Sequence, residues 1–132
     1  LRLYPPAFVM VRQAIEADRW RELSIPAGSL MMISPWVLHR HRRFWSNPDS
    51  FDPARFLEGA PAIPRLAYLP FGTGPRICVG AQFALTEAVL VLAILMKRFE
   101  VTLVHGQPVL PAAVVTTQPD HPALFHLRPR HR

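Results

Sequence analysis

The sequence predicts a loop-rich, mixed α/β fold, and three observations support this prediction. Fifteen prolines and six glycines among 132 residues impose many turns and argue against an all-helical bundle, because proline removes a backbone donor and ends helices. One long segment has the apolar periodicity of a helix, whereas several short segments have the composition of strands. Half of the residues are apolar, so a chain of this length can bury the core of a single domain.

The first third of the chain predicts strands and a tight turn. Residues 1–4 are expected to form the last turn of a helix, which the proline pair at positions 5 and 6 would end. A strand is expected over residues 8–14. Residues 20–25 and 29–34 flank a Pro-Ala-Gly turn sequence, in which proline presets one dihedral angle and glycine permits another. We therefore predict that these two segments pair as a hairpin.

The remainder predicts irregular chain, one long helix and three strands. A short helix is expected near residues 36–41, followed by a proline-rich irregular stretch to residue 68. Between residues 80 and 98 apolar residues recur at spacings of one, three and four, which indicates a helix with an apolar stripe. Its apolar run is shorter than the roughly 20 residues that a membrane helix needs, so no membrane segment is expected. Strands are expected over residues 101–104, 114–118 and 124–127.

The net charge of +6 raises the possibility of nucleic-acid binding, because clustered Lys and Arg are typical of phosphate recognition. Here the basic residues are scattered. The densest run, residues 39–43, contains no Lys and is followed by a turn sequence. We favour a solvated or structural role for this run and expect no nucleic-acid partner, while an acidic protein partner stays open.

The single cysteine, Cys78, excludes an internal disulfide, so its thiol is either a small buried hydrophobe or a reactive or metal-binding group. It stands just before the predicted helix, and helix N-termini and cations favour the thiolate, the form that ligates metals. Gly72 and Gly74 allow a tight turn close to a flat cofactor. Arg76 offers a planar fork for carboxylates such as haem propionates. This combination suits haem.

Other interpretations of this segment are weaker. A phosphate loop would need a Lys-Ser/Thr pair or a third glycine in the spacing G-x-G-x-x-G, and neither follows Gly74. Zinc needs more ligands than one cysteine and dispersed histidines offer. An arbitrary lone cysteine is more often a core residue, but the glycines and the arginine around Cys78 favour ligation.

The loop resembles the haem loop F-x-x-G-x-R-x-C-x-G of the cytochrome P450 family at all five defining positions. These positions are Phe71, Gly74, Arg76, Cys78 and Gly80. The resemblance extends along the chain. Residues 1–6 are similar to the end of the family's E-x-x-R helix with Arg2 as its arginine, and residues 53–56 resemble the P-E-R-F element with Arg55 in place. Arg12 matches by spacing a strand arginine that contacts a propionate.

The resemblance implies a fold and a set of site residues. Residues 1–132 would be the C-terminal haem-binding portion of one domain, mainly α in the whole protein, with the N-terminal portion absent. In order it would contain the end of the K helix, a β-hairpin, the meander, the Cys loop, the L helix and C-terminal strands. The cofactor implied is haem b, with Cys78 as iron ligand and catalytic residue. The cofactor-binding residues implied are Cys78, Arg76, Arg12, Phe71, Gly74 and Gly80.

The function that the resemblance implies is that of a haem-thiolate monooxygenase, which inserts one oxygen atom of O2 into a small organic substrate. Electrons would come from NAD(P)H through a ferredoxin, a flavodoxin or a flavin reductase. We expect Arg40, Arg42, Lys97 and Arg98 to help dock that donor on the Cys78 side. Residues 7–9 and 115–119 are expected near the substrate. A cytoplasmic location is expected.

Two other functions stay open at this stage. A haem-thiolate peroxygenase, isomerase or dehydratase would use this part of the fold equally well. The second alternative is a truncated remnant that binds no haem. The isolated 132-residue chain is expected to be inactive, because the groups that deliver protons and admit substrate would lie upstream of it.

Overall fold

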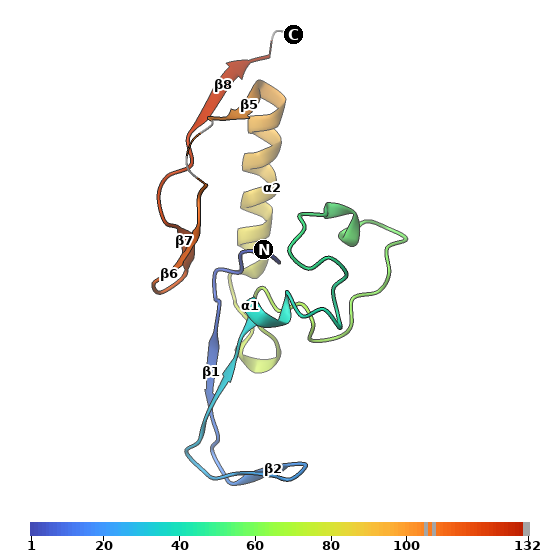
Figure 1. Ribbon diagram of the computed structural model, residues 1–132, viewed down its shortest axis with the longest axis vertical. Helices are drawn as coiled ribbons and strands as arrows, with labels where there is room; N and C mark the ends of the chain where they lie inside the picture. Colours follow the sequence, from blue (N-terminus) through green and yellow to red (C-terminus); the bar gives the residue numbers. More distant parts are fainter. Residues whose placement is uncertain (105, 107, 131–132) are drawn as a thin grey trace.

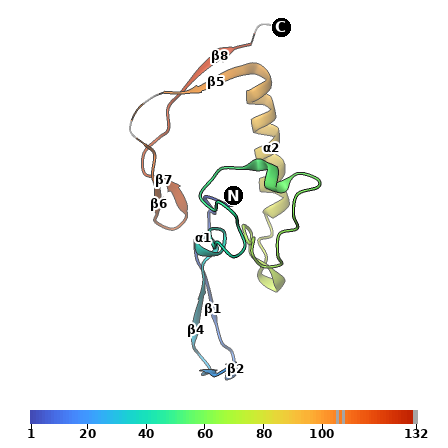
Figure 2. The ribbon, with the colours of Figure 1, turned by 45° about the vertical axis from the view of Figure 1, so that its right-hand side comes forward.

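In the computed structural model, which describes residues 1–104, 106 and 108–130, four separate antiparallel strand pairs are linked by irregular chain and one long helix (Figure 1). Strand β1 (Met10–Gln13) pairs with β4 (Leu30–Ile33), and β2 (Asp18–Trp20) pairs with β3 (Leu23–Ile25). The β2–β3 pair lies at the far end of the β1–β4 ladder, which extends away from the helix (Figures 1 and 2).

The predicted hairpin between residues 20–25 and 29–34 is therefore wrong, although both segments contain strands. The tight turn falls instead at Arg21, which adopts a positive φ of 53° between β2 and β3. The Pro26–Ser29 turn does form, with Gly28 at φ 83° and the Ser29 amide donating to the Pro26 carbonyl at 3.1 Å. It redirects the chain so that β4 returns along β1 rather than along β3, and Ala14 and Ser29 extend that ladder.

The helical turn predicted over residues 1–4 is not observed, since residues 3 and 4 form a bend and residues 1 and 2 have no regular structure. Tyr4 directly precedes Pro5, and a residue before proline is disfavoured in helical geometry. The short helix is confirmed as α1 (Pro35–Leu38), which begins at the cap residue Ser34 and has proline at its first position, where no donor is lost. After it, the chain is irregular apart from the 3-10 turns η1 (Pro53–Phe56) and η2 (Gly74–Arg76).

The long helix is confirmed as α2 (Ala81–Arg98), with Lys97 and Arg98 in its last turn, where cations interact favourably with the helix dipole. It leads directly into β5 (Phe99–Leu103), which pairs with β8 (Phe125–Pro129). Of the three predicted C-terminal strands, the first and last are confirmed. Among the helices of the described residues, none has the length and apolar character needed to cross a membrane.

The strand predicted over residues 114–118 is wrong in its position. Strands β6 (Pro111–Ala113) and β7 (Thr117–Pro119) form a hairpin, and residues 114–116 make the turn between them. Three successive β-branched residues at 114–116 gave this segment the composition of a strand. Pairing of the flanking segments outweighs that local preference.

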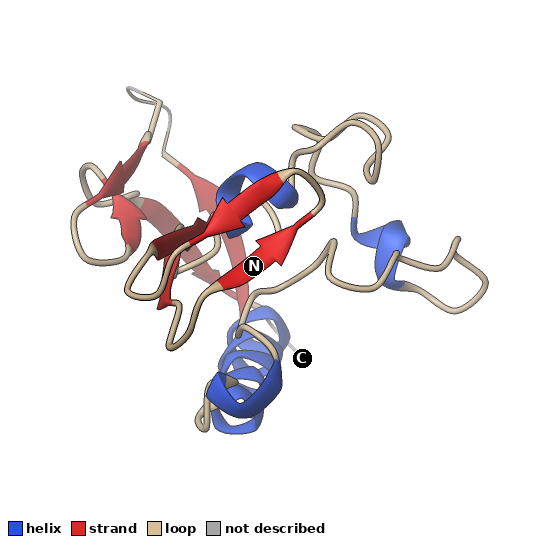
Figure 3. Ribbon diagram, turned by 90° about the horizontal axis from the view of Figure 1, so that it is seen from below, coloured by secondary structure: helices blue, strands red, loops and turns tan. Residues whose placement is uncertain are grey.

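The core of the described part of the chain is small and lies in the irregular segment. Buried apolar side chains there are Trp45, Ala67 and Leu69. The fully buried His39 accepts from the Leu69 amide and packs against Tyr68, which also contacts Trp45. Helix α2 has no buried residue, and large apolar side chains such as Phe83, Leu90 and Ile94 are exposed around it. Figure 3 shows α2 nearly along its axis, set apart from the strands and from the irregular segment.

The accessible surface confirms that the chain is far from compact. It measures 11139 Å², whereas a compact monomer of 15.0 kDa exposes roughly 7,000 Å². The excess of about 4,000 Å² is as large as an extensive obligate interface. The apolar side chains of α2 therefore require another polypeptide surface to cover them.

We predict that the 132-residue chain expressed alone does not form a compact monomer, because its apolar surface stays in water. Bound hydrophobic dye and the sedimentation coefficient measure this directly. Strong dye fluorescence and an expanded or self-associated species are expected. A compact monomer that binds no dye would contradict the prediction.

Candidate functional site

The loop around Cys78 is shaped by main-chain hydrogen bonds. The Cys78 amide donates to the carbonyl of Phe71 at 2.9 Å, and the Ile77 amide donates to the carbonyl of Gly74 at 3.0 Å. The Gly72 amide donates to the carbonyl of Leu69 at 3.3 Å, at the start of the loop. These bonds fold residues 71–78 into a compact turn whose two ends lie side by side.

Two glycines of this loop are required by their backbone conformation. Gly72 has φ 75° and Gly74 has φ 71°, values that residues with a Cβ atom rarely adopt. Around Gly74 no described atom lies within 4 Å of where a Cβ would be, so conformation rather than crowding within this chain favours glycine. Gly80 is different, since it has a negative φ and caps the N-terminus of α2.

The loop presents Cys78 as an exposed free thiol three residues before α2 begins. The first amides of a helix carry partial positive charge, which favours an anionic sulfur. Within the described residues, no N–H group donates to the sulfur. The carbonyl of Phe71 has the definite role of holding the Cys78 backbone.

Arg76 and Arg12 differ in how they are placed. Arg76 lies at the end of η2 with its side chain exposed, and no described residue forms a hydrogen bond or ion pair with its guanidinium. Arg12 is partly buried and donates to the neighbouring carbonyl of Val11. It shares a face of β1 with Met10, because alternate residues of a strand point the same way.

Met10 connects this face of β1 with the Cys78 loop. The sequence analysis did not predict this contact. Its sulfur lies 3.4 Å from the position that a Cβ of Gly72 would occupy. The face of β1 that carries Arg12 is therefore turned toward the loop. An exposed thiol, a free guanidinium and a second arginine on the facing strand are the donors that haem would need from this chain, so the residues fit that cofactor.

The described residues contain no group of three or more His, Cys, Asp or Glu side chains gathered as ligands of an ion. Cys78 alone supplies one ligand, and a macrocycle that brings its own four nitrogen ligands matches such a donor set better than zinc does.

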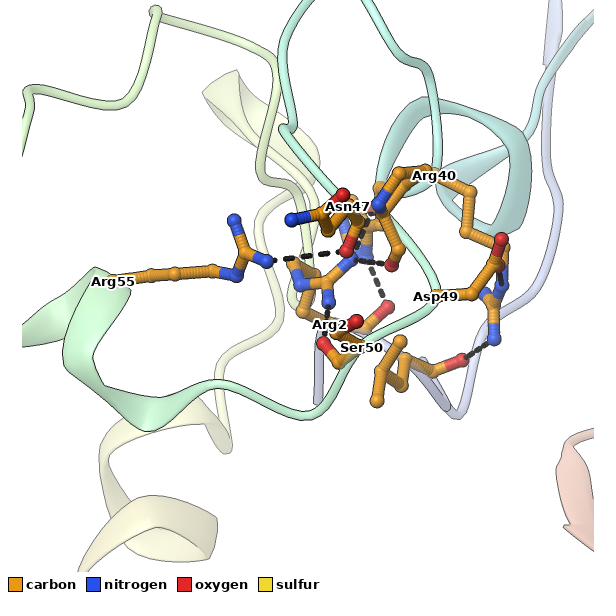
Figure 4. Close-up of polar contacts among 9 residues, drawn as sticks. Arg2, Arg40, Asn47, Asp49, Ser50 and Arg55 are labelled. Carbon is orange, nitrogen blue, oxygen red and sulfur yellow. Dashed lines mark hydrogen bonds and ion pairs between the residues drawn. The ribbon is translucent and has the colours of Figure 1, made fainter.

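A second cluster centres on Arg2, which is 5% exposed. Its guanidinium donates to the carbonyls of His39 at 2.8 Å and Ser50 at 2.7 Å, and also to the carbonyl of Pro48 (Figure 4). It also lies over the ring of Trp45, at 5.1 Å from the centroid. The buried cation is thus held by carbonyl dipoles and an aromatic face, without a carboxylate among the described residues.

Neighbouring cations act on Arg2. Burial, Arg55 and Arg40 lower the pKa of its guanidinium, whereas Asp49 and Asp52 raise it. Arg55 donates to the carbonyl of Asn47 at 3.1 Å and lies 3.6 Å from Asp52. Arg2 and Arg55, from two separate motifs of the sequence, thus lie in one cluster with a surplus of positive charge.

His39 is a candidate site residue that the sequence analysis did not identify, since it was considered only as part of the basic run 39–43. It is fully buried, with Nδ1 at 3.1 Å from the carbonyl oxygen of Arg2 and Nε2 at 2.8 Å from the amide nitrogen of Leu69. The run 39–43 therefore divides in two. His39 and Arg40 have structural roles, whereas residues 41–43 are exposed.

The expected docking surface for an electron donor needs correction. Arg40 is used inside the chain, where its guanidinium lies 3.7 Å from the ring centroid of Trp36 and 3.6 Å from Asp49. Lys97 and Arg98 lie at the opposite end of α2 from Cys78, and an 18-residue helix is about 27 Å long. Of the four residues, Arg42 keeps an exposed position near the segments that lead to the loop.

The two segments predicted to lie near a substrate do meet. The Thr117 amide donates to the carbonyl of Pro6 at 2.8 Å, and Phe8, Trp36 and Thr117 line one cavity of about 190 Å³. The start of β1 and the β6–β7 hairpin, more than a hundred residues apart, thus share a surface.

Comparison with known proteins places these features in a family. The family model for cytochrome P450 matches residues 1–123. A cyclooctatin synthase from Streptomyces melanosporofaciens is 42% identical over 112 residues, 84% of this chain and 24% of that protein. A cytokinin hydroxylase from Arabidopsis thaliana is 36% identical over 130 residues, 98% of this chain and 25% of that protein.

Among solved structures, the retinoic-acid-bound cyanobacterial CYP120A1 superposes with a TM-score of 0.91 at 29% identity, over 98% of this chain and 30% of its own. The chain spans about a quarter of the length of the curated relatives that it matches. The fold predicted from the resemblance, the C-terminal part of such a haem domain, is confirmed.

We predict that Arg2→Ala lowers the unfolding free energy of the full-length protein by about 3 kcal/mol, because it leaves the buried His39 carbonyl and the partly buried carbonyls of Pro48 and Ser50 without this donor. Urea unfolding followed by circular dichroism measures the loss. Arg128→Ala is the matched control. Arg128 is exposed and lies 3.9 Å from the exposed Glu100, and such a surface pair contributes about 0.5 kcal/mol. Equal losses in the two variants would contradict the role of Arg2.

Proposed function

This chain belongs to the cytochrome P450 family, and we propose that the protein containing it is a haem-thiolate monooxygenase in which Cys78 would ligate the haem iron. Residues 1–132 form the C-terminal haem-binding portion of one larger domain in this proposal. The observation that carries it is the exposed thiol of Cys78, held before α2 by a loop with positive-φ glycines.

Each loop residue has a definite task in this proposal. Cys78 holds the iron, and the N-terminus of α2 stabilises the negative charge of its sulfur. Phe71 and Gly74 provide the carbonyls that close the loop. Haem supplies the oxygen chemistry when bound, and a thiolate ligand favours cleavage of the O–O bond.

Arg76 and Arg12 bind the haem propionates in this proposal. The guanidinium of Arg76 is exposed beside Cys78, and Arg12 lies on the face of β1 that Met10 turns toward the loop. Planar guanidinium groups bind carboxylates in a bidentate manner, which fixes orientation as well as adding charge. The apolar substrate-facing wall includes Phe8 and Thr117, whose segments meet at one cavity. The substrate is a small organic molecule.

We further propose that electrons reach the haem from NAD(P)H through an acidic ferredoxin, flavodoxin or flavin domain in the cytoplasm. Arg42 and Arg65 are exposed cations in the two segments that His39 joins at the start of the Cys78 loop. Complementary charge steers such encounters and sets their rate. The exposed free thiol suits a reducing compartment, and fractionation of cells that express the full-length protein tests the location.

We predict that Cys78→Ser abolishes thiolate ligation in the full-length protein, because a serine hydroxyl stays protonated and neutral. The absorption spectrum of the reduced carbonyl complex measures this: the red-shifted Soret band of the wild type should be lost. Arg76→Gln should keep the band but release haem more readily, by roughly tenfold or more, since it removes a charge-assisted contact.

Ile77→Val is the matched control for these variants, since Ile77 neighbours Cys78, is exposed and has no proposed contact with haem. Its spectrum should equal that of the wild type. If the wild-type full-length protein takes up no haem, the proposed function is wrong.

We predict that the double variant Arg42→Gln/Arg65→Gln slows electron transfer from an acidic donor several-fold at low salt. The difference should disappear at high salt, where charges separated by more than a few ångströms are screened. Stopped-flow reduction of the haem measures the rate. Lys97→Gln/Arg98→Gln removes the same charge at the other end of α2 and should leave the rate unchanged. A slower rate in that control alone would contradict the placement.

A further inference from the structure

The imidazole of His39 is bonded at both of its nitrogens inside the described chain. The amide of Leu69 can only donate, so Nε2, at 2.8 Å, must accept from it. The hydrogen of the neutral ring is then on Nδ1, which donates to the carbonyl oxygen of Arg2 at 3.1 Å. The geometry thus selects one tautomer of an uncharged ring.

The backbone of His39 adds two more anchors to this contact. Its amide caps the end of α1 by donating to the carbonyl of Pro35 at 2.8 Å, and its own carbonyl accepts from Arg2 at 2.8 Å. Its ring also packs against Tyr68, with centroids 5.1 Å apart. One residue therefore joins the N-terminal segment, the end of α1 and the segment that enters the Cys78 loop.

A short path of main-chain bonds leads from Leu69 to Cys78. The carbonyl of Leu69 accepts from Gly72 at 3.3 Å, and the carbonyl of Phe71, two residues beyond Leu69, accepts from Cys78 at 2.9 Å. The position of the Leu69 backbone thus fixes where the loop begins. Phe71, which bonds to the Cys78 amide, links that position to the backbone of Cys78.

We propose that His39 is a positioning residue for the Cys78 loop, which its neutral ring ties to the N-terminal segment through the Leu69 amide. The role of the loop in holding haem rests on the proposed function. The tie itself consists of contacts within this chain and exists with or without haem.

The tie is sensitive to protonation, because a charged imidazole carries a hydrogen on Nε2 and would face the Leu69 N–H with a second donor. The charged groups around the ring are Arg2 from the first segment and Arg40 from the end of α1, with the Tyr68 phenol on the loop side. Burial, opposed by the bond to the Arg2 carbonyl and reinforced by these cations, lowers the pKa of His39 below its ordinary value of 6.5.

The sign of the pH dependence follows from this direction. Above pH 6.5 the ring is neutral in both the closed and the open loop, and the full stabilisation is present. As the pH falls below 6.5 the open form takes up a proton first, so the closed loop loses stability until the pH passes the lowered pKa of the closed form.

Two substitutions separate the two ring contacts. His39→Gln can place an oxygen near the position of Nε2, so it keeps an acceptor for Leu69 but cannot be protonated. His39→Asn can reach only the position of Nδ1, so it keeps the contact with Arg2 and loses Leu69. His126→Gln, at an exposed histidine of β8, is the control for removing a histidine.

The experiment measures amide hydrogen exchange by mass spectrometry in the full-length protein, both haem-free and haem-loaded, between pH 5 and 8. Peptides covering residues 66–80 report the loop, and peptides covering β5 and β8 report the rest. We expect His39→Asn to raise exchange in the loop by roughly tenfold at neutral pH, as loss of a buried hydrogen bond does, with little change in β5 and β8. His39→Gln should stay within about twofold of the wild type and should lack its increase in exchange below pH 6.5.

In the haem-loaded protein, the thiolate-type Soret band of the reduced carbonyl complex should weaken at low pH in the wild type and hold in His39→Gln. Equal exchange in wild type and His39→Asn would overturn the proposal. An equal rise of exchange in the loop and in β5 and β8, in both His39 variants, would also overturn it, because it would mean that His39 supports the packing of the whole chain. A wild type without haem uptake would sink the proposed function, whereas the haem-free exchange data would still decide the role of His39.

Discussion

The burial of the Arg2 guanidinium against main-chain carbonyls is the interaction on which the rest of the described chain depends. Arg2 collects the carbonyls of His39, Pro48 and Ser50, and in doing so it fixes the end of α1 and two points of the irregular segment. That irregular segment has little regular secondary structure to satisfy its backbone, so side-chain donors must do so. The small apolar core around Trp45 and Leu69 forms beside this cation, and His39 extends the same set of contacts to the Cys78 loop.

Some parts of this chain are stabilised by contacts within the chain, whereas others are not. The Arg2 and His39 contacts are internal, as are the hydrogen bonds of the Cys78 loop. Helix α2, in contrast, is apolar on most of its surface and buries no residue in this chain. A helix that is hydrophobic all round is normally a core helix, so α2 is built to be enclosed by other parts of a larger domain. The Cys78 loop is therefore supported on one side by the Arg2 and His39 contacts of this chain. On the side of α2 it depends on polypeptide outside the 132 residues.

Much of the fold and the centre of the site could be predicted from the sequence because they rest on local patterns. The apolar spacing of residues 83–99 predicted α2, and the composition of the loop predicted the tight turn at Gly72 and Gly74. Strand pairing was harder. The Pro26–Ser29 turn does form, but turn chemistry alone does not say which neighbouring strand will be the partner, and β4 pairs with β1. His39 was missed because a histidine in a basic run carries no local sign that tertiary contacts will bury it between Arg2 and Leu69.

The Cys78 loop is held in shape by its backbone, so side chains beside the sulfur can vary. The hydrogen bonds that close the loop are all between main-chain groups, and the conformations that need glycine are confined to two positions. The side chains of Ile77 and Val79, on either side of the sulfur, are exposed and hold none of this together. Substitutions there can alter the polarity and bulk around the thiolate while the loop keeps its geometry. Evolution and protein engineering thus have two adjustable positions next to the ligand, at which electronic properties can diverge without a change of fold.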